Sequence, residues 1–300
     1  MQKFIQHIGL LLVLVFVTML LVFSRINGYS DAYYLKLTSD KKSNLILGTS
    51  KALQGIQPTV LQNNLHKSFY NYAFAISISP YGSIYYSSIM EKLDTEDTNQ
   101  TFILAVDPWS LSSLTKNPND SSHFREKKAC LKDARNPKFA INFSYLFRYF
   151  DESFYFILKN KSTTFLHDDG WLEVTLNEDS ISVNRRIAFS TSLYASKIEN
   201  YHFSTLRYSY LLKTITFLQQ YGSVYLVRLP VHEAMLEVEN ELSPNFNTII
   251  QTAIDSSTAY FDLTSKNNDF TYTDGIHLTK ESGKEVSMII SDWIWKLEQK

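Results

Sequence analysis

Two short segments, far apart in the sequence, carry side chains whose types suit nucleophilic chemistry. Gly48-Thr49-Ser50 directly follows a short apolar run, and Asp274 stands three residues before His277. A serine hydroxyl becomes an effective nucleophile when a neighbouring base takes its proton, and histidine suits that task at neutral pH. An aspartate three residues earlier in a turn can reach the other ring nitrogen and fix its tautomer. The two segments therefore supply a candidate nucleophile, a candidate base and a candidate orienting carboxylate.

Each segment also has a simpler explanation. A serine at a strand-to-helix corner is more often a helix cap, and a D-x-x-H sequence also occurs by chance in solvated loops. The group of His232, Glu233, Glu237 and Glu239 has metal-ligating residue types, but a solvated helix face explains it better. The chain has no H-E-x-x-H sequence and a single cysteine, Cys130, so no metal site is predicted. It also lacks G-x-G-x-x-G and P-loop motifs, so no nucleotide cofactor is expected.

Five apolar runs separated by helical patterns predict the elements that position these side chains. Strands are expected at residues 44–47, 68–75, 101–106, 223–229 and 259–263. Helices are expected at about residues 57–65, 80–93, 204–221, 232–242, 246–256 and 280–298. This alternation predicts an α/β fold in which helices cover both faces of a mostly parallel five-stranded sheet. Ligands bind such sheets outside the carboxyl ends of the strands, where Ser50, Asp107 and Arg228 fall.

The segment at about residues 110–203 does not follow this alternation, and we interpret it as an insertion packed beside the main sheet. It contains an expected aromatic helix around residues 143–156 and a polar cluster, H-D-D-G-W, at residues 167–171. The cluster has two interpretations, a surface turn or a lid whose tryptophan stacks on a sugar ring. Residues 1–28 are then an anchor and connector, and residues 29–300 form one α/β domain that contains the insertion.

The pairing of G-x-S after the first strand with D-x-x-H just before the last helix resembles the SGNH/GDSL hydrolase family. That family has a three-layer α/β/α fold with a five-stranded parallel sheet, a first motif built around G-D-S and a last motif D-x-x-H. The resemblance covers about residues 44–109 and 204–297 and leaves the segment between them unmatched. It implies that Ser50 is the nucleophile, His277 the base and Asp274 the residue that orients the base.

The sequence departs from the family pattern around the expected oxyanion hole. Thr49 replaces the usual aspartate before the serine. The stretch that normally supplies a glycine N–H has no glycine here, so the backbone N–H of Ile76 or Ser77 is the expected donor. Asp107 stands where the family has an asparagine, and an ionised carboxylate cannot donate a hydrogen bond. Arg228, at the end of the fourth strand, is expected either to meet an anionic or polar substrate or to form a structural ion pair.

The apolar segment at residues 4–23 carries no charge from Ile8 to Phe23. Twenty helical residues at about 1.5 Å each span roughly 30 Å, the thickness of the hydrocarbon core of a bilayer. An uncleaved membrane anchor is therefore expected. The alternatives are a cleaved signal peptide, although no A-x-A pattern follows the segment, and a buried core helix, although the segment has no polar face. Basic residues flank both ends, but a short N-terminal stub before a large domain is usual for a signal anchor with the domain outside.

The formal net charge of −1 gives no basic field for nucleic acid, so no nucleic-acid partner is expected. Together with an anchor, the motifs are similar to those of divergent SGNH-like proteins of bacterial envelope polysaccharide systems, including alginate acetylation proteins. This resemblance implies a membrane-anchored, extracytoplasmic serine esterase or O-acyltransferase that acts on acyl groups of a carbohydrate, with an acyl-donating membrane protein as its candidate partner. The altered oxyanion motifs favour an alternative, a non-catalytic binding or assembly module in polysaccharide export or modification.

Overall fold

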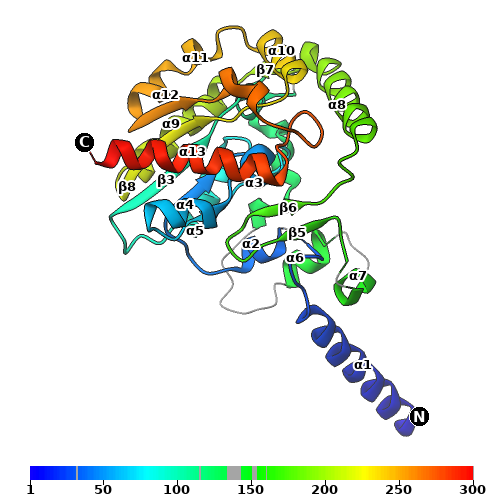
Figure 1. Cartoon of the computed structure of the whole chain (residues 1–300). Coiled ribbons are helices and arrows are strands. Elements are labelled where there is room, and N and C mark those ends of the chain that lie inside the picture. The colour runs from blue at the N-terminus through cyan, green and yellow to red at the C-terminus, as the bar shows by residue number, and fades with distance from the viewer. Residues whose placement is uncertain (32, 115, 134–142, 151–153, 160, 300) are drawn as a thin grey trace.

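A five-stranded parallel sheet forms the centre of the fold (Figure 1). The computed structural model describes residues 1–31, 33–114, 116–133, 143–150, 154–159 and 161–299. The strands of this sheet are β1 (Leu45–Leu47), β2 (Tyr70–Asn71), β3 (Gln100–Ala105), β8 (Gly222–Arg228) and β9 (Ala259–Asp262). Every neighbouring pair is parallel. The predicted α/β class and five-stranded parallel sheet are confirmed, although β2 is much shorter than the predicted strand at residues 68–75.

The strand order, β2-β1-β3-β8-β9, places a reversal between β1 and β3. From β1 the chain moves outward to β2, and it then crosses back to β3 and continues to β8 and β9. In doubly wound sheets, the connections that leave the two strands at such a reversal diverge to opposite sides and open a crevice. Ser50 follows β1 and Asp107 follows β3, so the order of the strands brings both residues to this crevice.

Side chains of the central strands point alternately into two hydrophobic clusters, one on each face of the sheet. Ile46 and Ile103 belong to one cluster, and Leu47 and Leu104 belong to the other. The first cluster is completed by residues of α3 (Ser50–Gly55), α4 (Pro58–Leu65) and α13 (Lys280–Glu298). The second is completed by residues of α5 (Ser83–Lys92), α9 (Thr205–Leu218), α11 (Phe246–Ile249) and α12 (Gln251–Ser256). Burial on both faces explains why the strands read as continuous apolar runs in the sequence.

The predicted helices outside the insertion are present, and α10 (Glu233–Leu242) is among them, but the single helix expected at residues 246–256 is divided into α11 and α12. The expected aromatic helix around residues 143–156 is replaced by two short helices, α6 (Phe143–Arg148) and α7 (Phe154–Lys159), and residues 151–153 lie outside the described residues. Three α-helices of the described residues were not predicted: α2 (Tyr34–Thr38), which lies in the expected connector, α3, which starts at Ser50, and α8 (Ser180–Ala195), which has no fully buried residue. A helix without a buried face has a weak apolar period, which explains why α8 does not stand out in the sequence.

The segment at residues 110–203 begins and ends at one place in the fold. Its first strand, β4 (Ser112–Ser113), pairs antiparallel with its last, β7 (His202–Phe203). Between them, β5 (Thr164–Leu166) and β6 (Leu172–Val174) form a hairpin. Short 3₁₀ helices complete the fold. They are η1 (Pro108–Leu111), η2 (Ser121–His123), η3 (Arg125–Lys128), η4 (Cys130–Asp133), η5 (Ile198–Asn200) and, after β9, η6 (Thr264–Asp269).

The polar cluster at residues 167–171 forms the turn of the β5–β6 hairpin. Trp171 is buried, its indole N–H donates to the backbone oxygen of Gln54 at 2.8 Å, and the His167 ring stacks on it with 4.6 Å between centroids. The turn therefore packs against α3. No residue of this turn lines the pocket at Ser50 described below, so the structure favours the surface-turn interpretation over a sugar-stacking lid.

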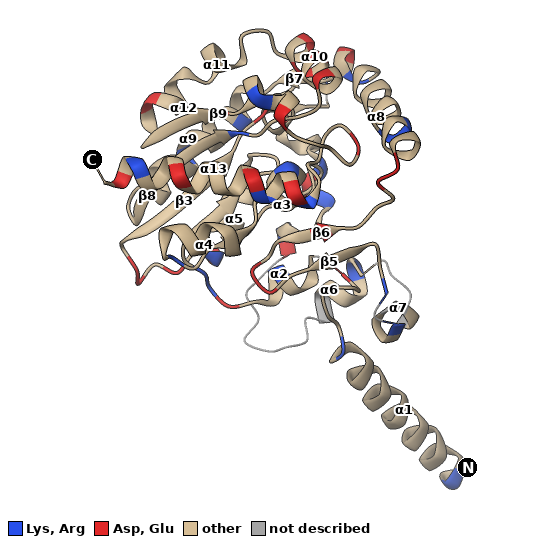
Figure 2. Cartoon of the chain, in the orientation of Figure 1, with Lys and Arg blue, Asp and Glu red and all other residues tan. Residues whose placement is uncertain are grey.

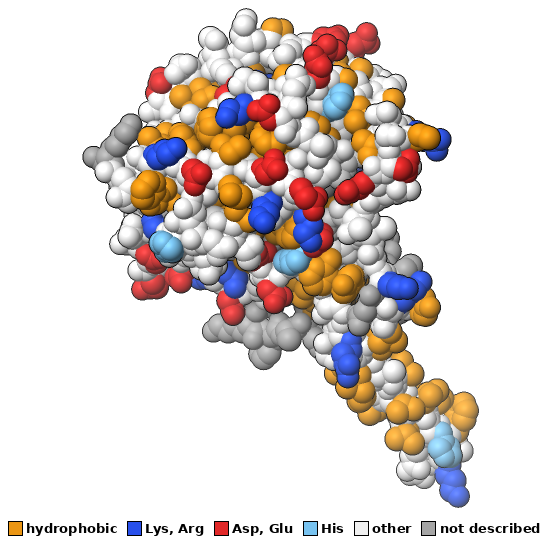
Figure 3. All heavy atoms as spheres, viewed as in Figure 1, with side chains coloured by type: hydrophobic (Ala, Val, Ile, Leu, Met, Phe, Trp, Pro, Cys, Tyr) orange, Lys and Arg blue, Asp and Glu red, His pale blue; other side chains and the backbone are white. Residues whose placement is uncertain are grey.

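The N-terminal helix α1 (Gln2–Phe23) projects away from the rest of the chain (Figure 1). Most of its apolar side chains are exposed, as Leu10 (69%) and Leu14 (61%) illustrate. Figure 2 shows charge only near its N-terminal end, and Figure 3 shows a mainly apolar surface along its length. Among the described residues, α1 is the one helix long and apolar enough to cross a membrane. Its exposure shows that it is not a buried core helix.

The connector after α1 is fastened to the edge of the sheet by two buried lysines. Lys36, in α2 (Tyr34–Thr38), donates to the backbone oxygens of Asn71 and Ala73 at 2.6 and 2.7 Å. Lys92, at the end of α5, donates to the backbone oxygen of Lys36 at 2.9 Å. Burial lowers the pKa of Lys92 to about 7, with a further decrease from the charge of Lys42. Backbone carbonyls therefore accept hydrogen bonds from the amino groups of both lysines.

Candidate active site

Ser50, His277 and Asp274 form a continuous hydrogen-bonded relay at the carboxyl ends of the central strands. The Ser50 Oγ lies 2.9 Å from His277 Nε2, and His277 Nδ1 lies 2.8 Å from Asp274 Oδ2. Folding thus brings together residues that are 227 positions apart in the sequence. Both contacts fall within the range of ordinary hydrogen bonds, so a proton can move from the serine to the imidazole without rearrangement of the chain.

A tight turn fixes the aspartate against the histidine. Asp274 Oδ1 accepts from the backbone N–H of Ile276 at 3.0 Å and from that of His277 at 2.9 Å. Gly275 has φ +85°, a left-handed conformation that other residues adopt only with strain. Its carbonyl oxygen accepts from the backbone N–H of His232 at 3.0 Å, at the start of α10. The turn therefore has its own internal bonds and a connection to a neighbouring helix.

The environment of Asp274 keeps its carboxylate ionised. Burial alone raises the pKa of this group, but the hydrogen bonds from the ring and backbone of His277, together with the charge of that ring, lower the pKa to about 2. An ionised carboxylate can only accept hydrogen bonds, so Nδ1 of His277 carries the hydrogen. In the neutral ring, Nε2 is then left as the acceptor, facing the Ser50 hydroxyl.

Gly48 allows the close approach that places Ser50 at the corner between β1 and α3. Its φ is +143°, and a Cβ at this position would lie 2.9 Å from the Cβ of Ala105 in β3. Ser50 is the first residue of α3, after Thr49 at the N-cap, and its hydroxyl is bonded to His277. The interpretation of Ser50 as a helix-capping serine is therefore wrong, and the hydroxyl is directed into the crevice.

A small, partly open pocket lies beside the serine, and its side chains leave room for about one water molecule. Its lining combines charged and apolar side chains and comprises Thr49, Ser50, Lys51, Ile76, Asp107, Trp109, Tyr194, Met235, Glu239 and Ile276. Tyr194 belongs to α8, and its ring packs edge-on against Trp109 with 4.7 Å between centroids. The unpredicted helix α8 thus supplies one wall of the pocket.

Buried charges behind the serine form an alternating network. Lys51, the residue after Ser50, pairs with Glu239 of α10 and lies 3.8 Å from Asp107. Glu239 also lies 3.5 Å from Arg228, which in turn lies 3.9 Å from Asp262. Every charge in this network faces one of opposite sign, which offsets the cost of burying it. The network connects the carboxyl ends of β1, β3, β8 and β9.

The residues predicted around the oxyanion hole have different surroundings. Ile76 lines the pocket, and its N–H donates to no protein acceptor among the described residues, whereas Ser77 does not line the pocket. Asp107 lines the pocket, but its Oδ1 accepts from the N–H of Ser110 at 2.9 Å and caps η1. Arg228 is buried within the ion network and is absent from the pocket lining. Its interpretation as a structural ion pair therefore fits the structure better than contact with a substrate.

Sequence reasoning missed several residues at the site. Glu239 was assigned to a solvated helix face, and this is wrong because it is fully buried. Met235 and Val238 are buried on the same side of α10, so the i, i+3, i+4 spacing of this helix was the available signal. Lys51 and Tyr194 gave no signal, because their roles depend on contacts between distant segments. Among the described residues, no group of three or more histidine, cysteine, aspartate or glutamate side chains is placed to hold a metal ion.

No family model matches this chain, and no curated protein is significantly similar to it in sequence. The function is therefore argued from the geometry of the site.

Proposed function

We propose that this chain is an SGNH-like serine esterase or O-acyltransferase that acts on acyl groups of envelope carbohydrate. The observation that carries the proposal is the relay from Ser50 Oγ through His277 to Asp274, with contacts of 2.9 and 2.8 Å. A serine bonded to the acceptor nitrogen of a histidine whose other nitrogen is held by an ionised carboxylate is the arrangement that nucleophilic acyl chemistry requires.

The proposed reaction passes through an acyl-enzyme. Ser50 Oγ attacks the ester carbonyl carbon and His277 Nε2 takes the hydroxyl proton. The tetrahedral intermediate then collapses, the bond to the leaving alcohol breaks, and His277 returns the proton to that alcohol. In the second half, water or a sugar hydroxyl gives its proton to His277 and attacks the acyl carbon. The bond from that carbon to Ser50 Oγ then breaks, and His277 returns the proton to Oγ. Asp274 stays ionised throughout and stabilises the charged imidazolium.

Three features support the SGNH-like assignment. The serine follows the first strand of a parallel sheet with the order β2-β1-β3-β8-β9, and the D-x-x-H turn directly precedes the last helix, α13. Hydrophobic clusters with helices on both faces of the sheet fit the three-layer arrangement of that family. These positions match the resemblance in the sequence even where Thr49 and Asp107 replace the family's residues.

The oxyanion would be held by backbone donors in this proposal. The N–H groups of Ser50 and Ile76 donate to no protein acceptor among the described residues, and both residues line the pocket. The turn that carries Ile76 is fixed to β1, because Ser79 Oγ donates to the backbone oxygen of Gly48 at 2.8 Å. Loss of one oxyanion donor typically lowers the rate about 10²–10³-fold, so we expect slow hydrolysis with Asp107 in place of a donor.

The pocket favours a short acyl group. Its free space is that of about one water molecule, and its walls include the buried charges of Lys51, Asp107 and Glu239. A long alkyl chain would have to displace these side chains and desolvate their charges, which is unfavourable. Among acyl groups, an acetyl group therefore requires the least rearrangement of the side chains that line the pocket.

The N-terminal helix supports a location at the membrane. Because α1 is apolar, exposed and long enough to span a bilayer, we propose that it is an uncleaved anchor with the domain on the extracytoplasmic side of a bacterial envelope. An anchored domain can receive acyl groups from a membrane protein that carries them across the bilayer, and such a protein is the candidate partner.

One observation favours a second candidate function, a non-catalytic binding or assembly module of a polysaccharide system. The carboxylate of Asp107 occupies the place where an oxyanion donor is expected, and it is held there by Lys51 and by the N–H of Ser110. A domain that had lost catalysis could keep the relay as a structural element.

Turnover assays separate these two candidates. The full chain in detergent micelles is assayed for hydrolysis of p-nitrophenyl acetate, and then for acetyl transfer to added oligosaccharides. We expect slow hydrolysis that is abolished in Ser50→Ala and unchanged in Ser87→Ala, which removes an exposed hydroxyl on α5. If the folded wild-type chain neither hydrolyses the ester nor transfers the acetyl group, the enzymatic proposal fails and the binding module is favoured.

A further inference from the structure

The end of the N-terminal helix is part of the hydrophobic core of the domain. Phe23, the last residue of α1, is buried and belongs to the cluster that contains Leu47 of β1. Met19 and Val22, on the preceding turn, pack against the same cluster. The Phe23 ring also lies edge-on to the ring of Phe150, with 6.4 Å between their centroids. The packed domain therefore begins on the last turn of the apolar helix.

The connector that follows α1 is fastened to the insertion at two points. The backbone N–H of Leu166, in β5, donates to the Gly28 oxygen at 2.8 Å, and a Cβ on Gly28 would collide with the backbone oxygen of Leu166. The carboxylate of Asp31 accepts from the backbone N–H of Tyr34 at 3.0 Å and from the hydroxyl of Tyr145, in α6, at 2.9 Å. These contacts, together with the burial of Phe23, fix the direction in which α1 leaves the domain.

The part of α1 that the domain leaves uncovered is shorter than the hydrocarbon core of a bilayer. Side chains are exposed from Gln2 to Thr18, and the domain covers part of the helix from Met19 onward. About seventeen helical residues at about 1.5 Å each span about 25 Å, against roughly 30 Å for the hydrocarbon core. Any tilt of the helix shortens its vertical reach further. An anchor that spans this core must therefore bring the adjoining part of the domain to the bilayer surface.

The elements beside this end of α1 expose apolar side chains. Helix α7 packs against α1, and Figure 1 shows α6 and α7 next to the C-terminal end of α1. Phe147 of α6 is 71% exposed, and Tyr155 and Leu158 of α7 are 63% and 61% exposed. We call these three side chains the α6–α7 patch. Apolar groups that gather on one exposed surface are typical of a contact with another apolar phase or with a protein.

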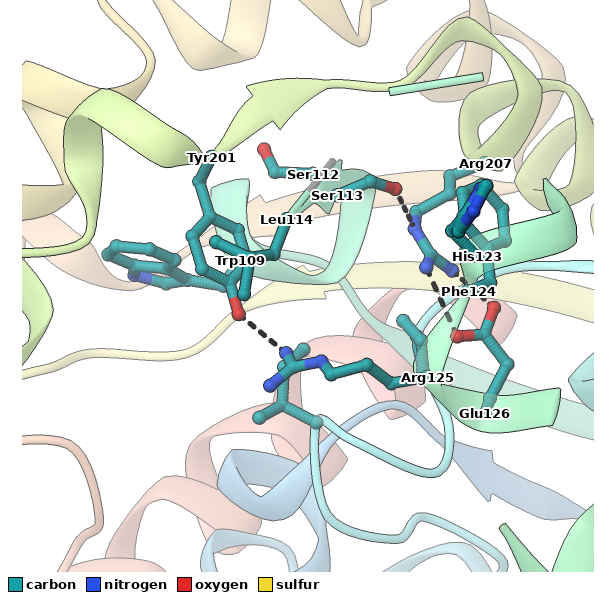
Figure 4. Close-up of a pocket in the computed structure, with 12 residues that line it drawn as sticks. Trp109, Ser112, Ser113, Leu114, His123, Phe124, Arg125, Glu126, Tyr201 and Arg207 are labelled. Carbon is teal, nitrogen blue, oxygen red and sulfur yellow. Dashed lines mark hydrogen bonds and ion pairs between the residues drawn. The ribbon is translucent and has the colours of Figure 1, made fainter. Parts of the chain in front are cut away.

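The α6–α7 patch is supported from the inside of the domain. Tyr145, Leu146 and Ile157, on the inner sides of α6 and α7, belong to the same core cluster as the end of α1. Helix α6 also packs against η4, which contacts η3. Glu126 of η3 forms a two-bond pair with Arg207 of α9 at 2.7 and 3.1 Å, as Figure 4 shows. Because the inner sides of the two helices are already packed, the patch can leave water only against another surface.

We propose that the α6–α7 patch is a second membrane contact, which holds the domain against the bilayer surface beside the anchor. Phe147 and Leu158 enter the boundary between headgroups and acyl chains, to a depth of about 5–10 Å. Tyr155 suits the same level, because tyrosine is enriched where a membrane meets water. Lys159 Nζ lies 5.4 Å from the centre of the Tyr155 ring and can extend its ammonium group toward lipid phosphates.

The inference rests on one part of the proposed function, the location of α1 in a membrane. It goes beyond that function because it fixes the height and the orientation of the domain above the bilayer. A domain that hung on a free linker would present every face to the membrane. A domain held at two contacts presents the same face to a membrane-bound acyl donor at each encounter.

Depth-dependent fluorescence quenching tests the contact in the full chain. Single cysteines replace Phe147, Leu158, Leu10 or Ile181, each is labelled with an environment-sensitive fluorophore, and circular dichroism checks the fold. The proteins are reconstituted in liposomes whose phospholipids carry a nitroxide near the carbonyl end or near the methyl end of the acyl chain. Ile181→Cys, on α8, is the matched control, since Ile181 and Phe147 are each 71% exposed. Wild type gives the background, because Cys130 is buried and its burial raises the pKa of the thiol to about 12.

We expect the labels at Phe147 and Leu158 to lose fluorescence to the nitroxide near the carbonyl end. The label at Leu10 should lose fluorescence to the deeper nitroxide, and the label at Ile181 should keep its fluorescence with both. The membrane contact is overturned if the Leu10 label is quenched while the labels on the patch respond no more than the label at Ile181. Equal quenching at Ile181 also overturns it, because lipid would then meet the domain without preference for the patch.

The same set of variants separates this proposal from the proposed function. An unquenched label at Leu10 would remove the membrane anchor and, with it, the second contact. A quenched label at Leu10 without quenching of the patch would keep the anchor and remove only the second contact. Fluorophosphonate labelling of Ser50 in detergent micelles requires neither contact, so it reports on the nucleophile independently of both.

Discussion

Replacement of Asp274 by asparagine tests the relay most sharply, because the change leaves the size of the side chain unaltered. In Asp274→Asn, the amide oxygen can still accept from the backbone N–H groups of Ile276 and His277, which are 3.0 and 2.9 Å from Oδ1. The amide NH₂ then takes the place of Oδ2, 2.8 Å from His277 Nδ1. A donor at that position requires Nδ1 to act as acceptor, so the hydrogen moves to Nε2 and faces the Ser50 hydroxyl at 2.9 Å. The imidazole can no longer accept the serine proton.

The expected loss is about 10³–10⁴-fold, or about 4–5 kcal/mol of transition-state stabilisation, which is the effect of a wrong tautomer in a serine triad. The assay is the second-order rate of Ser50 labelling by a fluorophosphonate, measured across pH. The same carboxylate also affects the free energy of unfolding, because folding lowers the pKa of Asp274 from 3.8 to about 2. Its contribution to that free energy is present above about pH 4 and is lost as the pH falls toward 2. This acid dependence of the free energy of unfolding should be absent in Asp274→Asn. A labelling rate within about threefold of wild type would refute the relay.

Three further substitutions test the framework around the site. Glu239→Ala leaves two buried cations without this partner and should lower the free energy of unfolding by about 3–5 kcal/mol in denaturant titrations, whereas Glu237→Ala, on the exposed side of α10, should have almost no effect. Gly48→Ala places a Cβ 2.9 Å from a β3 side chain at φ +143°, so the melting temperature should fall and Ser50 labelling should slow; a variant as stable as wild type would contradict this packing. The pKa of Lys92 is lowered from 10.5 to about 7, so between these pH values the unfolded chain binds one more proton than the folded chain. The free energy of unfolding should therefore rise by about 2 kcal/mol from pH 7 to 9. If it rises equally with pH in wild type and in Lys92→Met, the lowered pKa of Lys92 is contradicted.

The central sheet was predictable because its strands are buried on both faces and read as continuous apolar runs. The same runs end at Gly48, Asp107 and Arg228, so their carboxyl ends were visible in the sequence. The short β2 was overestimated because the apolar residues after Asn71 enter a turn whose conformation depends on contacts with Gly48 and Asn71 itself. Apolar residues that are buried in irregular structure look like the residues of a strand in the sequence. The pattern of a single sequence does not separate the two.

The catalytic candidates were predictable for a different reason. Ser50 and the D-x-x-H turn each carry a local signature, and the first strand and the last helix pack in one hydrophobic cluster. The ion network was not predictable, because the pairing of Lys51 with Glu239 joins segments 188 positions apart and neither has a local motif. Tyr194 was hidden for the same reason: the period of α8 is weak, and its role depends on Trp109.

Mass spectrometry of a trapped adduct shows directly whether Ser50 is a nucleophile that His277 activates. The full chain is treated with a fluorophosphonate, digested, and the modified residue is identified by peptide sequencing. We expect one adduct, on Ser50, that is absent in Ser50→Ala, is lost in His277→Ala and is retained in His202→Ala, which removes an exposed histidine on β7. An unmodified Ser50 in the folded protein, or an adduct that forms equally well without His277, would contradict it.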